Sequence, residues 1–274
     1  MKVAYLGPQG TFSEEAANRY FGGENAQFVR CDSIPEVIEA VGEHRVDKGI
    51  APLENMMEGT INMTIDSLLS YKDVHIEGEY LLPVSLHLLV NEYTERSSIQ
   101  EVWSIPPIFT QSRQYIRNLG AICVNYDSSA SAALQVKRSG RKDVAAIGPA
   151  LLADLHGLQI LESNIEDHPD NETRFIVVSR EKITGLQRKK TMFVITPNEE
   201  YPGVLSGILN ILSALSINLS WIESRPTARK LGTYRFILES DSDCSFETLN
   251  KAITILTTLG HEIRVLGRYD SRQS

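Results

Sequence analysis

The chain has 274 residues, which at roughly 100–200 residues per domain predicts two domains. Its 27 basic and 35 acidic residues give a formal net charge of −8, which argues against a nucleic-acid-binding protein that relies on clustered Lys and Arg. With 42% hydrophobic and 23% charged residues, the composition is that of a globular protein and excludes disorder over most of the chain.

From residue 1 to about 178, short apolar runs alternate with helical patterns. We expect strands at residues 2–6, 27–30, 48–53, 84–90, 102–105, 122–126 and 144–147. We expect helices at residues 12–21, 34–43, 61–69, 111–119 and 129–137. This alternation predicts an α/β fold with ligand sites at the carboxyl ends of strands.

Residues 179–190 break the alternation, because they are polar and basic and contain Gly185, which is typical of a linker. Beyond it, we expect strands at 191–196, 218–223, 234–239 and 262–266, with helices at 204–215 and 246–259. This βαββαβ order is that of a ferredoxin-like module. Such a module leaves one sheet face open and tends to pair with a second copy.

Two turns between a strand and a helix are candidate anion sites. Gly7-Pro8-Gln9-Gly10-Thr11-Phe12-Ser13 follows the first strand, and Asp127-Ser128-Ser129 precedes a later helix. Each turn alone is an ordinary capped helix start, but free N–H groups there can hold a carboxylate or phosphate. The pair suits a substrate with two carboxylates. Nucleotide binding is not expected, because neither Gly-x-Gly-x-x-Gly nor Gly-Lys-Ser/Thr occurs.

Two further segments carry polar side chains. In Pro52-Leu53-Glu54-Asn55, Asn55 can both donate and accept hydrogen bonds, although the segment also reads as a plain polar loop. In Asn171-Glu172-Thr173-Arg174-Phe175, an Arg at a strand start suits a carboxylate, although a surface ion pair is the alternative. The six histidines show no metal-ligand spacing, so no metal is expected.

Three scattered cysteines, Cys31, Cys123 and Cys244, fit a reducing compartment and form no zinc motif. The first apolar run ends at Gly7-Pro8, too short for a signal-peptide core. No stretch approaches the roughly 20 apolar residues of a membrane span. We therefore expect a cytoplasmic protein that binds neither nucleic acid nor membrane.

Taken together and in this order, the segments resemble the prephenate dehydratase family. The matching residues are Gly7-Pro8-x-Gly10-Thr11-Phe12-Ser13, Pro52-Leu53-Glu54-Asn55 with Glu58-Gly59, and Asn171-x-Thr173-Arg174-Phe175. The tail looks like an ACT regulatory domain, with Pro202-Gly203-Val204-Leu205-Ser206 at a helix start and Ile217-Asn218-Leu219 running to Glu223-Ser224-Arg225-Pro226. The resemblance covers nearly the whole chain.

The resemblance implies a two-lobed, periplasmic-binding-protein-like catalytic domain at residues 1–179, a linker at 180–190 and an ACT domain at 191–270. It implies a carbon–oxygen lyase that converts prephenate to phenylpyruvate, CO2 and water in L-phenylalanine biosynthesis. No metal or organic cofactor is implied. L-Phenylalanine is the implied allosteric inhibitor, bound between ACT domains of a homodimer or homotetramer.

The resemblance also assigns roles to residues. Thr173 matches an essential threonine, whose hydroxyl is too weak an acid to ionise and would donate a hydrogen bond to the departing oxygen. Arg174 would orient a carboxylate or stabilise developing charge, and Asn55 would complete the catalytic group. Substrate contacts would come from Thr11, Ser13, Glu54, Ser128, Ser129, Asn171 and Phe175. Phenylalanine contacts would come from Gly203, Val204, Leu205, Ser206, Asn218, Glu223, Ser224 and Arg225.

The chain departs from the family pattern in two places. Met56 stands where many relatives have a small or hydroxyl residue, and Ile105 and Pro107 replace a His and a Gln. These departures keep alternatives open. The chain could be a non-catalytic amino-acid sensor, an arogenate dehydratase, or an enzyme that decarboxylates prephenate without dehydration.

Overall fold

The structure, a computed structural model, describes residues 1–181, 189–199, 201–227, 230–241 and 246–273. It forms two compact units. The core unit comprises residues 1–71, 80–176 and 273–274, and the C-terminal unit comprises residues 72–79 and 177–272. Most of the predicted linker, residues 182–188, and the third cysteine, Cys244, lie outside the described residues. In the part of the chain that is described, no helix is long and apolar enough to span a membrane.

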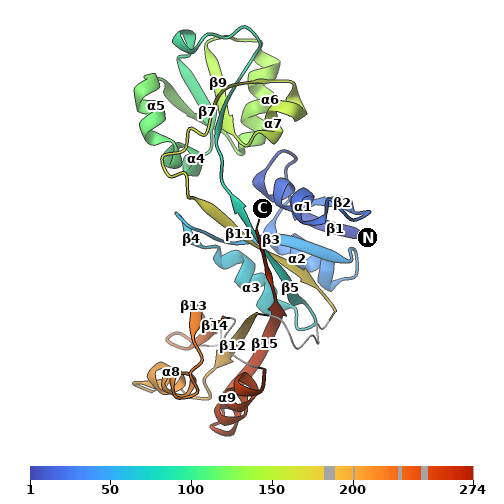
Figure 1. Ribbon diagram of the computed structural model, residues 1–274, viewed down its shortest axis with the longest axis vertical. Coiled ribbons are helices and arrows are strands. Elements are labelled where there is room, and N and C mark those ends of the chain that lie inside the picture. The colour runs from blue at the N-terminus through green and yellow to red at the C-terminus, as the bar shows by residue number, and fades with distance from the viewer. Residues whose placement is uncertain (182–188, 200, 228–229, 242–245, 274) are drawn as a thin grey trace. The chain divides into compact units, whose positions relative to one another are not determined.

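The first lobe of the core unit has the strand order β11-β3-β1-β2; β1 pairs in parallel with β2 and β3, and the short β4 pairs with β3 in the antiparallel sense (Figure 1). Helices follow the strands in sequence, as the alternation predicted. The carboxyl ends of β1 and β3 lead into the candidate segments that begin at Gly7 and Asn55. The elements are β1 (Lys2–Leu6), α1 (Phe12–Phe21), β2 (Gln27–Cys31), α2 (Ile34–Gly42), β3 (Lys48–Asn55), β4 (Gly59–Thr60), α3 (Asn62–Ser70) and β11 (Glu172–Ser179).

The second lobe contains a five-stranded sheet with the order β10-β6-β9-β7-β8. Side chains alternate across it, so Val102 of β7 packs with α4 and α5 while Trp103 packs with α6 and α7 on the other face. The strands are β6 (His87–Val90), β7 (Glu101–Ser104), β8 (Ile122–Asn125), β9 (Val144–Gly148) and β10 (Gln159–Ser163). The helices are η1 (Arg96–Ser98), α4 (Pro106–Gln111), α5 (Arg113–Leu119), α6 (Ser129–Ser139) and α7 (Leu151–His156).

The structure corrects several element boundaries. The helix expected at 111–119 begins at Arg113 as α5, and an additional short helix, α4, precedes it. The Pro residues at the start of α4 fit the first helical turn, where their missing N–H groups cost nothing. The strand expected at 84–90 covers only His87–Val90. The longer strand β5 (His75–Pro83) was not predicted. Its acidic residues Glu77 and Glu79 interrupt the apolar pattern expected of a buried strand, although both are buried. The short elements β10 and α7 were also missed.

The C-terminal unit confirms the βαββαβ order and its antiparallel sheet, β13-β14-β12-β15. Helices α8 and α9 cover one face, where Phe193 and Leu238 are buried against them. Gly267 of β15 pairs with Ile76 of β5, and a Cβ on this glycine would overlap the Ile76 carbonyl oxygen. The elements are β12 (Lys190–Thr196), α8 (Val204–Ala214), β13 (Leu219–Pro226), β14 (Tyr234–Ser240), α9 (Phe246–Thr258), β15 (Glu262–Tyr269) and β16 (Ser271–Gln273).

Candidate active site

The centre of the site lies where β3 ends and β11 begins. Asn55 is the last residue of β3 and Thr173 is the second residue of β11, which lies beside β3 in the sheet. The backbone N–H of Met56 donates to the carbonyl of Glu172 over 3.0 Å, which fixes the two strand ends together. Two segments that are remote in sequence therefore place their polar side chains at one point.

The orientation of Asn55 is determined by backbone groups. Its Oδ1 accepts from the N–H groups of Met57 at 2.9 Å and Glu58 at 3.1 Å. Because a carbonyl oxygen must face these two donors, the amide nitrogen Nδ2 has to point the other way. Nδ2 donates to Thr173 Oγ1 at 2.9 Å and also lies 3.3 Å from Asn171 Oδ1.

Thr173 is held as a directed hydroxyl. Its side chain is only 8% exposed, and its oxygen is occupied as an acceptor by the Asn55 amide. The hydroxyl proton is therefore available to donate elsewhere, because a hydroxyl group has one donor and two acceptor positions. Chemically, this arrangement provides an oriented hydrogen-bond donor rather than a base.

The second lobe contributes Gln111, which our sequence reasoning did not select. Gln111 lies at the end of α4; its Oε1 accepts from Asn171 Nδ2 at 3.3 Å, and its Nε2 donates to Glu58 Oε1 at 3.1 Å. Both Gln111 and Asn171 are buried. A continuous hydrogen-bond chain thus runs from the second lobe through Asn171 to Asn55 and Thr173. The one available signal was that Gln111 lies in the segment that departs from the family pattern.

Arg174 and Glu54 form a separate pair. Arg174 Nη1 lies 3.7 Å from Glu54 Oε2, and the Arg174 side chain is 10% exposed. Successive residues of a strand point to opposite faces, so Glu54 and Arg174 share one face while Asn55 and Thr173 share the other. The structure brings Asn55, Asn171 and Thr173 together but does not place Arg174 beside the Thr173 hydroxyl. Phe175 is buried at 1% exposure.

The first predicted anion turn is the start of α1. Thr11 is the N-cap, and its Oγ1 accepts from Glu14 N, while the N–H of Gly10 donates to Glu14 Oε2 at 2.5 Å. Ser13 is 6% exposed. Within the described ranges, the N–H groups of Phe12 and Ser13 have no hydrogen-bond partner, so they can receive an anion.

The second predicted anion turn is the start of α6. Ser128 and Ser131 form a reciprocal capping box, and Ser129 is buried. A Cβ on Gly148 would lie 2.7 Å from Leu152 Cδ1 and 3.3 Å from Ser129 Cβ. A Cβ on Gly10 would overlap the other methyl of Leu152, so the turn before α1 and the end of β9 both lie against this one side chain.

Known proteins resemble this chain over its whole length. The family model described as "Prephenate dehydratase" matches residues 3–183. The chain belongs to the prephenate dehydratase family. The prephenate dehydratase of Bacillus subtilis (strain 168) is 33% identical, and the match covers 100% of both chains.

Two solved structures of the family are also similar over most of their length. That of prephenate dehydratase from Staphylococcus aureus subsp. aureus Mu50 has a TM-score of 0.88 and 36% identity, and covers 98% of this chain and 100% of that one. The complex of the Arthrobacter aurescens prephenate dehydratase with L-Phe has a TM-score of 0.89 and 31% identity, and the match covers 98% of this chain and 90% of that one.

The two departures from the prephenate dehydratase pattern have clear places in the fold. Met56 is 68% exposed, so the site interior does not have to accommodate its side chain. Ile105 is partly buried against the second-lobe core, and Pro107 lies in the first turn of α4. The altered segment therefore still forms the helix that ends at Gln111.

The predicted phenylalanine-binding residues all lie in the C-terminal unit. Gly203 is the N-cap of α8 with φ +94°, a conformation that favours glycine, and a Cβ there would meet no atom within 4 Å. Asn218 donates to Asp241 Oδ2 at 2.6 Å. Along the start of α8, Val204 is buried, Leu205 packs on the core and Ser206 is exposed, while Glu223, Ser224 and Arg225 follow one another on β13.

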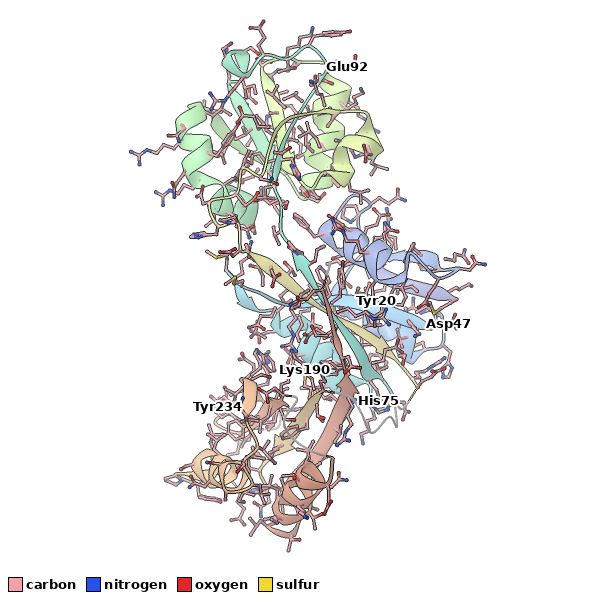
Figure 2. All side chains as sticks on the ribbon, in the orientation of Figure 1. Tyr20, Asp47, His75, Glu92, Lys190 and Tyr234 are labelled. Atoms are coloured by element: carbon pink, nitrogen blue, oxygen red, sulfur yellow. The ribbon has the colours of Figure 1, made fainter. Side chains whose placement is uncertain are left out.

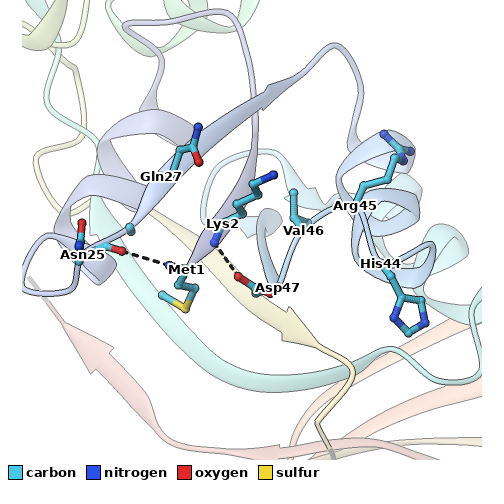
Figure 3. Close-up of a pocket in the computed structure, with 9 residues that line it drawn as sticks. Met1, Lys2, Asn25, Gln27, His44, Arg45, Val46 and Asp47 are labelled. Carbon is cyan, nitrogen blue, oxygen red and sulfur yellow. Dashed lines mark hydrogen bonds between the residues drawn. The ribbon is translucent and has the colours of Figure 1, made fainter.

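A polar depression of about 570 Å³ lies elsewhere in the core unit (Figure 3). It contains the hydrogen bonds from the Met1 amino group to Asn25 O and from Lys2 N to Asp47 Oδ2. These residues lie at the amino ends of β1 and β2, whereas prephenate dehydratase motifs follow the carboxyl ends of β1 and β3. Ligands of parallel sheets bind at carboxyl ends, so this depression is not the candidate active site.

Proposed function

We propose that the chain catalyses the decarboxylative dehydration of prephenate to phenylpyruvate, CO2 and water, as a carbon–oxygen lyase. The observation that carries the proposal is the contact between Asn55 Nδ2 and Thr173 Oγ1, which makes the Thr173 oxygen an acceptor and leaves its hydroxyl proton to donate to another group. Membership of the prephenate dehydratase family and full-length similarity to its enzymes support the same reaction.

In the proposed reaction, the bond between the ring and its carboxylate breaks and releases CO2. The electron pair of that bond completes the aromatic ring, and the carbon–oxygen bond to the ring hydroxyl breaks. The departing oxygen takes up one proton and leaves as water. Aromatisation makes the step favourable and involves no net oxidation, so no cofactor is required.

The residues have distinct proposed roles. Thr173 donates a hydrogen bond to the departing oxygen, where negative charge develops, and Asn55 fixes the direction of that donor. The N–H groups at the starts of α1 and α6, with Thr11, Ser13, Ser128 and Ser129, bind the substrate carboxylates. Because the chain has a net charge of −8, its overall field does not attract a dianion, and the attraction is proposed to come from these N–H groups close to the substrate.

Arg174 supplies a positive charge on the face of β11 opposite to Thr173, where it is paired with Glu54. This position favours a role in orienting the site over direct contact with the departing oxygen. Asn171 and Phe175 flank Thr173 in sequence, and both are buried, so their proposed role is to support the substrate site around Thr173.

The C-terminal unit is proposed to be an ACT domain that binds L-phenylalanine and inhibits the enzyme. The βαββαβ order, the positive φ of Gly203 and the L-Phe complex of the Arthrobacter aurescens relative support this assignment. Proposed ligand contacts are Gly203 to Ser206, Asn218 and Glu223 to Arg225, with a second subunit completing a homodimer or homotetramer. The proposed domain boundaries are 1–179 and 191–270, and the proposed location is the cytoplasm.

The deciding experiment incubates purified protein with prephenate, with and without L-phenylalanine. We expect phenylpyruvate, detected by its ultraviolet absorbance in alkali, and a lower rate when phenylalanine is present. Binding of phenylalanine with no turnover would instead identify an amino-acid sensor. In a parallel incubation with arogenate in place of prephenate, formation of phenylalanine, with no turnover of prephenate, would identify an arogenate dehydratase. A non-aromatic product from prephenate would identify simple decarboxylation.

A further inference from the structure

A charged cluster in the C-terminal unit, buried except for a lysine that is 25% exposed, takes no part in the chemistry proposed above. Lys190 of β12 (Figure 2) places Nζ 2.9 Å from Oε1 and 3.2 Å from Oε2 of Glu79 on β5, and 3.5 Å from Glu239 Oε1 on β14. The Tyr269 hydroxyl on β15 donates to Glu239 Oε2. The two carboxylates and the tyrosine are at most 1% exposed. We call these four residues the Lys190 cluster.

The position of the cluster is not explained by stability alone. Removing two carboxylates from water costs free energy that attraction to a partly exposed ammonium group does not always return, so a buried ion pair is weak evidence of a stabilising role. Phe236 and Leu238 of β14 face α8 and α9, so Glu239 lies on the opposite face of the sheet. On that face the cluster links four strands, β5, β12, β14 and β15.

One end of the cluster reaches the strand proposed to bind phenylalanine. Ser220 of β13 donates to Glu239 Oε1 at 2.6 Å. The register of β13 against β14 shifts between Leu219 and Trp221, so Ser220 occupies an irregularity that redirects its side chain. Ser220 therefore connects the buried Glu239 with the strand that continues to Glu223.

The other end leads toward the active site along the chain. Glu79 N donates to Asp270 O at 3.1 Å within the C-terminal unit, and β5 then continues to Pro83 in the core unit. The next residue, Val84, donates its N–H to the carbonyl of Asn171 at 2.8 Å. Asn171 belongs to the hydrogen-bond chain that holds Asn55 and Thr173.

We infer that the Lys190 cluster couples phenylalanine binding on β13 to the active site. A ligand that shifts β13 changes the contact between Ser220 and Glu239, which redistributes Lys190 between Glu239 and Glu79. The altered ion pair between Lys190 and Glu79 shifts β5, and this shift moves Val84, which is hydrogen-bonded to Asn171. The inference rests on the proposed function, and it requires that phenylalanine favours one arrangement of the cluster over the other.

The first test replaces an exposed residue, so the fold is preserved. Ser220→Ala removes the link to Glu239, and Ser213→Ala, an exposed serine of α8, is the matched control. We expect Ser220→Ala to keep its rate without phenylalanine within twofold of the parent and to bind phenylalanine by calorimetry. Its inhibition at saturating phenylalanine should fall to less than half that of the parent, while Ser213→Ala is inhibited normally.

A second variant tests the centre of the cluster. Lys190→Met keeps the aliphatic stem and removes the charge, and Lys189→Met changes the neighbouring exposed lysine. If Lys190→Met fails to fold, Glu239→Gln, which keeps the shape of the side chain, replaces it. Full inhibition by phenylalanine in both Ser220→Ala and the central variant would overturn the inference, even if the dehydratase activity is established.

Amide hydrogen exchange separates this inference from the proposed function. In the parent, phenylalanine should alter exchange in residues 80–84 and 171–176, and Ser220→Ala should reduce that response. If the parent does not convert prephenate but shows this response, the proposed function fails and the coupling stands. If phenylalanine leaves both segments of the parent unchanged, the coupling is wrong.

Discussion

Asn55 Nδ2 lies 2.9 Å from Thr173 Oγ1 and joins two residues that are 118 positions apart in the chain. The relationship has a direction, because two backbone N–H groups hold the Asn55 carbonyl oxygen on the other side. The threonine oxygen thereby accepts from Asn55, and its hydroxyl proton is left to donate to another group. The site is defined by this direction as much as by the identity of its residues.

Thr173→Val should remove most of the dehydratase activity. Valine has the shape of threonine without the hydroxyl, and loss of one donor to developing charge costs about 10²–10³-fold in kcat. Prephenate turnover and circular dichroism check the rate and the fold. Thr173→Ser, which restores a hydroxyl, is the control and should recover a substantial part of kcat. Near-normal turnover by the valine variant would show that this hydroxyl is not the donor.

Asn55→Asp tests the direction of the hydrogen bond. The carboxylate can still accept from Met57 N and Glu58 N, but it cannot donate to Thr173 and instead competes for its proton. We expect kcat to fall about 10²-fold, by the same loss of a preorganised donor. The matched control is Asn91→Asp, because Asn91 is a buried asparagine that donates to Val136 O and Arg141 O in the second lobe. That variant should lower stability and leave kcat of the folded protein unchanged, and equal kcat losses in both variants would contradict the assignment.

Sequence reasoning identified the polar residues of the site better than their relationships. Thr173 and Asn55 were named from motifs, but alternation along β3 and β11 determines that Arg174 pairs with Glu54 on the other face. Gln111 was missed because a glutamine at the end of a short helix has no distinctive pattern. Strand β5 was missed because Glu79 is buried by a partner that only the folded chain supplies, Lys190. Local patterns predicted the α/β and βαββαβ orders, whereas contacts between remote segments required the structure.

Gln111→Ala should weaken the organisation of the site without removing a reacting group. The substitution leaves Asn171 Nδ2 and Glu58 without their contacts from the second lobe, so Asn55 and Thr173 are less firmly placed. We expect kcat/KM to fall about tenfold, which corresponds to about 1.4 kcal/mol. Gln114→Ala, on the exposed face of α5, is the control and should match the parent. Steady-state kinetics measure kcat/KM for both variants. Equal kcat/KM values would show that Gln111 does not contribute to the site.

Gly10→Ala should destabilise the core unit more than Gly120→Ala. Both glycines have positive φ, +83° and +73°, so alanine costs about 1–2 kcal/mol at either position. Only at Gly10 would the added Cβ also overlap Leu152, which adds about 1–3 kcal/mol, whereas nothing lies within 4 Å at Gly120. Urea unfolding measures both losses. A Gly10→Ala variant no less stable than Gly120→Ala would mean that α7 moves away from the turn at little cost.

His87 should make the protein less stable in mild acid. Burial lowers the pKa of His87 below its ordinary value of 6.5, against the opposing charges of Glu166 and Glu15, and its Nδ1 is buried. The unfolded chain therefore binds a proton at a higher pH than the folded chain does. The contribution of neutral His87 is complete above pH 6.5 and is lost as the pH falls through this value toward the lower pKa of the folded state.

His87→Gln should accordingly reduce the difference between the free energies of unfolding at about pH 8 and about pH 5.5, measured by urea titration. His156 contributes in the same sense, since burial also lowers its pKa, so part of the difference should persist in the variant. His168→Gln, in an exposed loop, is the control and should keep the pH dependence of the parent. An unchanged pH dependence in His87→Gln would show that His87 is hydrated in solution and titrates normally.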